Sequence, residues 1–204
     1  MSEALYLAFH RLGALQHDAH APKDEVTLGT RLGEGAAFFA MEPEELAAAR
    51  GATVLAHVSG YGTAFSPPES EATLIHASSE AIERAMRFAL EDAGLSPSDV
   101  DVVGASVSGL PAFDAAELAA IGRVFGPSVC VAAPKAVLGE TLGAGGGMAM
   151  AGAIAWLGGT AHAPVAPFPI VRGEMRAREV RTVLVNAMGF YGNASTVVMQ
   201  RASL

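Results

Sequence analysis

Apolar residues recur every three or four positions in several segments of the chain, which is typical of helices that bury one face. The clearest segment covers residues 80–93, where Ser78 or Ser79 precedes the apolar stripe as a cap and Gly94 ends it. Further helices are predicted at residues 4–16, which are apolar on most faces, at 42–50, which are amphipathic, at 114–125, and at 141–157, which are rich in Gly and Ala.

Short apolar runs between these helices predict strands at residues 53–61, 100–105, 129–132, 182–187 and 196–201. Residues 33–41 form a further continuous apolar run after two glycines, and we predict a buried strand there that pairs with 53–61 like a hairpin. Because strands and helices alternate, the predicted class is α/β, with one mixed five-stranded sheet and helices on both faces. Residues 1–30 are expected to be a helix and loop that lead into one domain at 31–204.

The composition is more apolar than that of an ordinary soluble domain. Hydrophobic residues make up 51% of the 204 positions and charged residues 17%, against about 25% charged residues in typical domains. Either the core is unusually large, or another protein covers part of the apolar surface.

Several classes of partner are not expected. The net charge of −8 and the lack of a Lys/Arg cluster argue against nucleic acid. The most apolar segment, residues 143–157, is shorter than the ~20 residues that cross a bilayer, so no membrane span is expected. Residues 1–3 do not open a secretory leader with a basic region and an apolar region, so we expect a cytoplasmic protein.

No metal or cofactor is expected either. The single cysteine, Cys130, excludes an intrachain disulfide and a cysteine-rich metal site. His17 and His20 flank a carboxylate, but they stand in a polar segment without further ligands, so a solvated loop is the favoured interpretation. The glycines at 143–147 lack the Lys-Ser/Thr ending of a phosphate loop and the spacing of a dinucleotide fingerprint.

Seven short motifs follow one another in the order and approximate spacing of one family. They are Leu32–Ala37, Glu45–Ala52, Ser66–Pro68, Ala89–Leu95, Ala133–Lys135 with Gly139, Gly143–Gly147 and Gly189–Asn193. Together they resemble the C-terminal half of β-ketoacyl synthases over essentially the whole chain. The resemblance implies a thiolase fold, in which two similar α/β halves stack and the active site lies between them.

The family's catalytic residues do not carry over to this sequence. The nucleophilic cysteine of the family belongs to the first half, and Cys130 matches no such position; we interpret it as a buried structural thiol. The resemblance places Ser106 where a first histidine stands, and Glu140, after Lys135, where a second one stands.

These two replacements matter because the histidines of the family donate hydrogen bonds to the thioester oxygen and help to decarboxylate the extender. An ionised glutamate only accepts hydrogen bonds and repels developing negative charge. Losing a single oxyanion donor typically costs ~10²–10³ in rate. Lys135 and Glu140 are five positions apart, and we predict a structural ion pair if the loop at Gly139 brings them together.

The pattern is most similar to chain-length factors, which are inactive ketosynthase homologues that pair with an active one. The resemblance implies a non-catalytic subunit of fatty acid, polyketide or polyene biosynthesis that forms an obligate oligomer. Its expected partner is a ketosynthase or a separate thiolase-like N-terminal half, with acyl carrier protein as a further candidate. The residues expected at the substrate pocket or interface are Ser108, Pro111, Phe190, Tyr191 and Asn193.

A second hypothesis stays open at this point. The chain could be an acyl-thioester acyltransferase or hydrolase in which Glu140 acts as a base and a partner supplies the nucleophile. Turnover of acyl-thioesters by the chain would distinguish this enzyme from a non-catalytic subunit.

Overall fold

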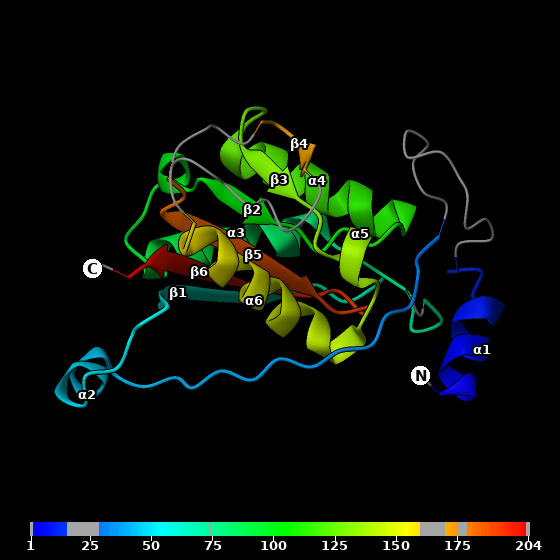
Figure 1. Cartoon of the computed structure of the whole chain (residues 1–204). Helices are drawn as coiled ribbons and strands as arrows, with labels where there is room; N and C mark the ends of the chain where they lie inside the picture. Colours follow the sequence, from blue (N-terminus) through cyan, green and yellow to red (C-terminus); the bar gives the residue numbers. More distant parts are fainter. Residues whose placement is uncertain (1, 16–28, 74, 160–169, 175–178, 203–204) are drawn as a thin grey trace.

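The fold is built on one six-stranded sheet, seen in a computed structural model that describes residues 2–15, 29–73, 75–159, 170–174 and 179–202 (Figure 1). The strand order is β1-β6-β5-β2-β3-β4. β2, β3 and β5 run parallel to one another, whereas β1, β6 and β4 join by antiparallel pairing. The strands are β1 Ala56–Phe65, β2 Val102–Gly104, β3 Cys130–Ala132, β4 Ile170–Arg172, β5 Thr182–Met188 and β6 Asn193–Arg201.

Helices cover both faces of the sheet, as predicted. The long helices α3 Ser79–Asp92 and α4 Pro111–Phe125 pack on one face, and α6 Gly145–Leu157 packs on the other. The shorter helices are α1 Glu3–Arg11, α2 Glu44–Ala49 and α5 Lys135–Leu138, with 3₁₀ turns at Pro97–Asp99 and Leu142–Ala144.

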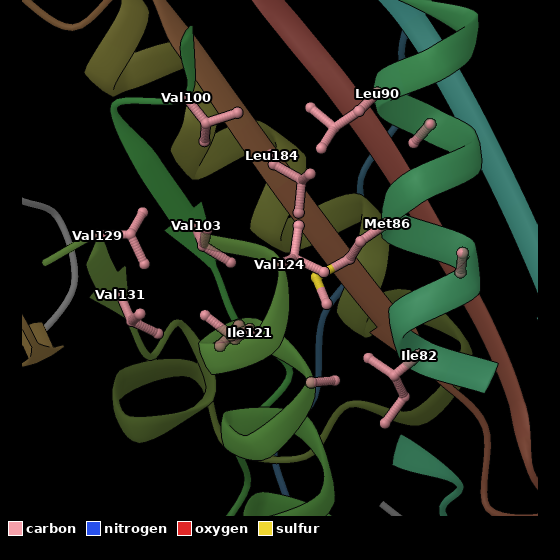
Figure 2. Close-up of a cluster of buried hydrophobic side chains, with 14 of the residues drawn as sticks. Ile82, Met86, Leu90, Val100, Val103, Ile121, Val124, Val129, Val131 and Leu184 are labelled. Carbon is pink, nitrogen blue, oxygen red and sulfur yellow. The ribbon is translucent and has the colours of Figure 1, made fainter. Parts of the chain in front are cut away.

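Alternate residues of the central strands supply the two cores. Val103 and Leu184 point into the core under α3 and α4, where they meet Met86 and Ile121 (Figure 2). The neighbouring residue Val102 points into the other core, under α6. Because successive side chains of a strand face opposite ways, central strands between two helical layers must be apolar throughout, and Val102–Gly104 is fully buried.

Apart from residues 33–41, the predicted helices and strands within the described residues agree with the structure in type, with shifted ends. α3 begins one residue before the prediction, and Ser78 Oγ accepts a hydrogen bond from Ala81 N at 3.2 Å. α4 begins three residues earlier than predicted, because Pro111 suits the first turn of a helix. The predicted loop at residues 17–30 lies almost wholly outside the described residues.

Two predictions about strands were wrong. Residues 33–41 are not a buried strand; they form an extended arm that carries no strand pairing with the described residues, and the Phe38 side chain is 96% exposed. The sheet has six strands instead of five, because β4 pairs with β3 at the edge. β4 has only three residues, which is too short for an alternating pattern to be visible.

β1 lies directly against helix α3, and its glycines make this possible. A Cβ atom added at Gly62 would lie 2.5 Å from Ala89 N and closer still to Ala85 O. Both atoms belong to the backbone of α3, so neither can rotate away.

We therefore expect Gly62→Ala to lower the free energy of unfolding by roughly 1–3 kcal/mol or more through overpacking. The measurement is urea unfolding followed by circular dichroism. Gly143→Ala is the matched control, because a Cβ there meets no atom within 4 Å. Equal stability of the two variants would contradict the close contact between β1 and α3.

Candidate functional site

Two of the predicted site segments follow the parallel strands β2 and β3. Gly104 pairs with Ala132 in register, and Ala105 N donates to Ala132 O at 2.9 Å. Ser106 follows β2, and Lys135 follows β3. In open α/β sheets, ligand sites lie beyond the carboxyl ends of the strands, so the fold places both segments at such an edge.

The ion pair predicted between Lys135 and Glu140 is present, and it is buried. Lys135 Nζ lies 2.6 Å from Glu140 Oε2, and the two side chains are 11% and 2% exposed. The other oxygen, Oε1, accepts from Leu142 N at 2.7 Å. Both carboxylate oxygens are thus occupied by donors of this chain, which leaves Glu140 poorly placed to act as a base.

The loop around Glu140 is held on two sides. Gly139 has φ 74° and packs against Gly33, where a side chain would collide with backbone. Glu140 N donates to Arg31 O, and Gly33 N donates to Glu140 O. The start of the extended arm and Glu140 therefore pair as one short parallel bridge. This bridge fixes the backbone of Glu140.

Ser106 belongs to a buried polar network that the sequence alone did not reveal. Ser106 N donates to Glu117 Oε1 at 2.9 Å, and Asn186 Nδ2 donates to the same oxygen at 3.0 Å. Thr196 Oγ1 in turn donates to Asn186 Oδ1 at 2.8 Å. The network ties the segment after β2 to α4, β5 and β6.

Glu117 is fully buried, and this burial raises the pKa of its carboxyl group to about 7. Its hydrogen bonds with Ser106 and Asn186 act in the opposite direction and lower the pKa. Its second oxygen, Oε2, has no hydrogen-bond partner among the described residues. One signal could have found it: Glu117 lies four positions after Phe113 and four before Ile121, on the buried stripe of α4. A carboxyl group on such a stripe needs polar partners.

Asp114 organises the turn that leads into α4. Its two oxygens accept from Ser108 N and Gly109 N, each at 2.9 Å. Burial raises the pKa of Asp114, while these two hydrogen bonds lower it. Ser108 is half-buried in this turn and Pro111 is exposed at the first position of α4.

The turn between β5 and β6 places its two aromatic residues differently. The ring of Phe190 packs 5.6 Å from that of Phe9 and 5.5 Å from that of Phe113, between centroids, whereas Tyr191 is 40% exposed. Asn193 is exposed at the start of β6. Phe190 thus belongs to a small core with α1, and Tyr191 turns its side chain towards the surface.

The glycines of this turn differ in the same way. Gly192 has φ 87°, in the region that favours glycine. Gly189 is not among the residues with positive φ.

Cys130 has the character of a structural thiol. It lies at the start of β3, at the opposite end of the strand from the Lys135 segment, and it is 3% exposed. Burial raises the pKa of its thiol, which disfavours the reactive thiolate. Within the described ranges, no group of three His, Cys, Asp or Glu side chains is arranged to hold a metal ion, and no helix has the length and apolar character to cross a bilayer.

The fold and the site define an α/β half-domain of ketosynthase type, with a buried ion pair and a serine at the edge where the strands end. The comparisons agree: the family model for the β-ketoacyl synthase C-terminal domain matches residues 55–168. The chain belongs to the β-ketoacyl synthase family.

Its similar relatives include polyketide ketosynthase subunits. The chain is 37% identical to the actinorhodin polyketide putative β-ketoacyl synthase 2 of Streptomyces coelicolor, over 90% of this chain and 46% of the relative. It is 35% identical to the tetracenomycin polyketide synthase ketoacyl synthase β subunit of Streptomyces glaucescens, over 91% and 47%. Among solved structures, the ishigamide ketosynthase/chain length factor superposes with a TM-score of 0.83 at 29% identity, over 100% of this chain and 52% of that one.

The chain therefore spans about half the length of the relatives that it matches. The resemblance to ketosynthases of the chain-length-factor type, and its restriction to the C-terminal half, are confirmed.

Proposed function

We propose that this chain is a non-catalytic, chain-length-factor-like subunit that assembles with an active ketosynthase, or with a separate N-terminal half, in polyketide or fatty acid biosynthesis. The observation that carries the proposal is the buried ion pair of Lys135 and Glu140. It occupies the position at which the family resemblance places a histidine that donates to the thioester oxygen.

This ion pair removes the donor that condensation needs. Both oxygens of Glu140 accept hydrogen bonds from within the chain, so the residue offers nothing to an oxyanion. The position of the family's other histidine holds Ser106, whose backbone N donates to Glu117. The same geometry argues against the alternative of a thioester hydrolase or acyltransferase with Glu140 as base, because Lys135 holds the carboxylate.

The partner follows from how much of the fold the chain covers. Relatives about twice as long include the tetracenomycin β subunit, and in the family the active site lies between two stacked halves. We infer that a second polypeptide region supplies the cysteine and histidines and covers the apolar surface, so that the working form is an oligomer in the cytoplasm. Acyl carrier protein is a further candidate partner through the assembled ketosynthase.

The test is a malonyl-thioester condensation assay with the purified chain. We expect no product from the wild-type chain, and none from the double variant Ser106→His with Glu140→His. The reason is that the only thiol of the 204 residues, Cys130, is buried at the far end of β3. Condensation by either form without a partner would overturn the proposal.

The same preparations distinguish the alternative enzyme. If the wild-type chain hydrolysed acyl-thioesters or transferred their acyl groups, and Glu140→Gln abolished that activity, the non-catalytic proposal would be lost. We expect neither activity above the background rate.

A further inference from the structure

A carboxylate of this chain fills a small set of donors beside the start of α6. Glu140 Oε2 accepts from Lys135 Nζ at 2.6 Å, and Glu140 Oε1 accepts from Leu142 N at 2.7 Å. Oε1 also lies 4.0 Å from the point where a Cβ atom on Gly145 would stand. Gly145 is the first residue of α6, so the carboxylate lies at the end of the helix that favours an anion.

An unused hydroxyl donor lies at the same place. Thr141 Oγ1 is buried and finds no hydrogen-bond partner within the described ranges. A Cβ atom on Gly145 would lie 3.6 Å from Thr141 Oγ1 and 3.4 Å from Lys135 Cε. Hydroxyl, ammonium and backbone amide thus come together around one carboxylate. We call this set the carboxylate cradle, and its members are Lys135, Thr141, Leu142 and Gly145.

One member of the cradle has a strained backbone. Leu142 has φ 54°, and no other residue except glycine has positive φ in the part of the chain that the structure describes. This region is unfavourable for an L-amino acid, and the Leu142 side chain is 37% exposed, so its burial does little to offset the cost. The Leu142 amide donates to Glu140 Oε1 in this conformation. Strain of this kind is concentrated at sites that clamp ligands.

The cradle has more donors than an ion pair requires. Lys135 alone would neutralise the charge of Glu140, whereas an added backbone amide and a helix N-terminus are what anion-binding sites provide. The side chains of Glu140 and Lys135 are 2% and 11% exposed, so the cradle is shielded from most of the solvent. Glu140 therefore occupies its donors as a bound carboxylate ligand would.

We propose that Lys135, Thr141, Leu142 and Gly145 form a binding site for a small free carboxylate, and that Glu140 closes this site by filling it from within the chain. In the wild type, a carboxylate ligand has to displace Glu140 before it can reach Lys135. The contact is therefore autoinhibitory. The proposal goes beyond the proposed function and does not rest on it, because condensation assays test one and carboxylate binding tests the other.

Glu140→Ala opens the site, and acetate is the probe. Beyond Cβ, the Glu140 side chain consists of one methylene and one carboxylate, which are the heavy atoms of acetate. We expect acetate to raise the urea midpoint of Glu140→Ala above its value in chloride at the same ionic strength. At an acetate concentration about ten times the Kd, the unfolding equilibrium constant should fall about tenfold. The wild type should show only the general effect of the salt, because its site is filled.

Lys135→Met with Glu140→Ala is the matched control, because it has the same opened space without the cation. This double variant should respond to acetate as the wild type does. Trimethylacetate, which carries the same charge on a bulkier group, should not stabilise Glu140→Ala beyond its effect on the wild type. Equal responses of the single and double variants to acetate would overturn the proposal. Glu140→Ser is a second opened variant; if it and Glu140→Ala both stay unfolded in acetate, the proposal also falls, because a ligand of the native state favours folding.

A second readout observes Lys135 directly. The sequence has two lysines, Lys23 and Lys135, so a chain labelled with ¹³C at lysine Cε gives two NMR signals, which Lys23→Arg assigns. We expect acetate to shift the Lys135 signal of Glu140→Ala in a saturable manner, and to leave that of the wild type in place.

Two other carboxyl groups compete with acetate for the ammonium group. Burial raises the pKa of Asp114 and of Glu117, and the charge of Lys135 acts in the opposite direction on both. If Lys135 turned to one of them in Glu140→Ala, its signal would not respond to acetate. That result would show that the cradle holds Glu140 only as a structural ion pair, and it would overturn the proposal.

Discussion

Lys135→Met is expected to lower the free energy of unfolding by about 3–5 kcal/mol, because it leaves the carboxylate of Glu140 buried without a counter-charge. The Glu140 side chain is 2% exposed and has Lys135 Nζ at 2.6 Å, so the variant removes a charged donor from a buried carboxylate. The measurement is urea unfolding at neutral pH, followed by circular dichroism.

The double variant Lys135→Met with Glu140→Leu is the control for this result. Replacing a whole buried ion pair by apolar side chains is often neutral, so we expect the double variant to recover most of the loss. Part of the loss should remain, because Glu140 Oε1 also accepts from Leu142 N. A single variant within 1 kcal/mol of the wild type would show that Glu140 is hydrated or neutral in solution.

Glu117→Gln is expected to remove part of the pH dependence of stability. The pKa of Glu117 in the folded chain is about 7, above its ordinary value of 4.5. Between these two values the native state keeps a proton that the unfolded state releases, so the stability of the wild type falls as the pH rises from 4.5 to 7. Above pH 7 the full loss is present, on the order of 3 kcal/mol for this difference in pKa.

Glutamine cannot ionise, and its amide can accept from Ser106 N as the carboxyl group does. We therefore expect unfolding of Glu117→Gln at pH 5 and pH 8 to differ less than unfolding of the wild type does. Some slope should persist, because burial also raises the pKa of Asp114. Glu91→Gln, at an exposed position of α3, is the control and should keep the wild-type slope. An unchanged slope in Glu117→Gln would refute the buried, proton-holding carboxyl group.

Periodicity and apolar runs were sufficient to predict α3, α4, α6 and most of the sheet. They failed at residues 33–41 for a physical reason. An apolar run indicates that a segment is suited to burial, but it does not indicate which polypeptide the segment packs against. Phe38 is exposed in this chain, although its sequence surroundings are those of a buried strand.

The site was only half visible in the sequence. The ion pair of Lys135 and Glu140 was predictable, because the two residues are only five positions apart, on either side of the turn at Gly139. The links between Ser106, Glu117 and Asn186 were not predictable in this way. They join β2, α4 and β5, and Glu117 and Asn186 are 69 positions apart, so only the packed fold brings them together.

The pairing of β1 also has a consequence for how the chain is made. The only described neighbour of β1 in the sheet is β6, and the hydrogen bond from Ser59 Oγ to Val198 O joins residues 139 positions apart. A ribosome therefore releases β1 long before it makes the strand that β1 pairs with, and contacts of such high sequence separation form slowly. During that interval α3 and β1 have no completed sheet to pack on, and β1 waits as an unpaired strand, which is a hazard for aggregation. Co-synthesis beside a partner or a chaperone would shorten this exposure, so the yield of soluble chain should depend on what is expressed with it.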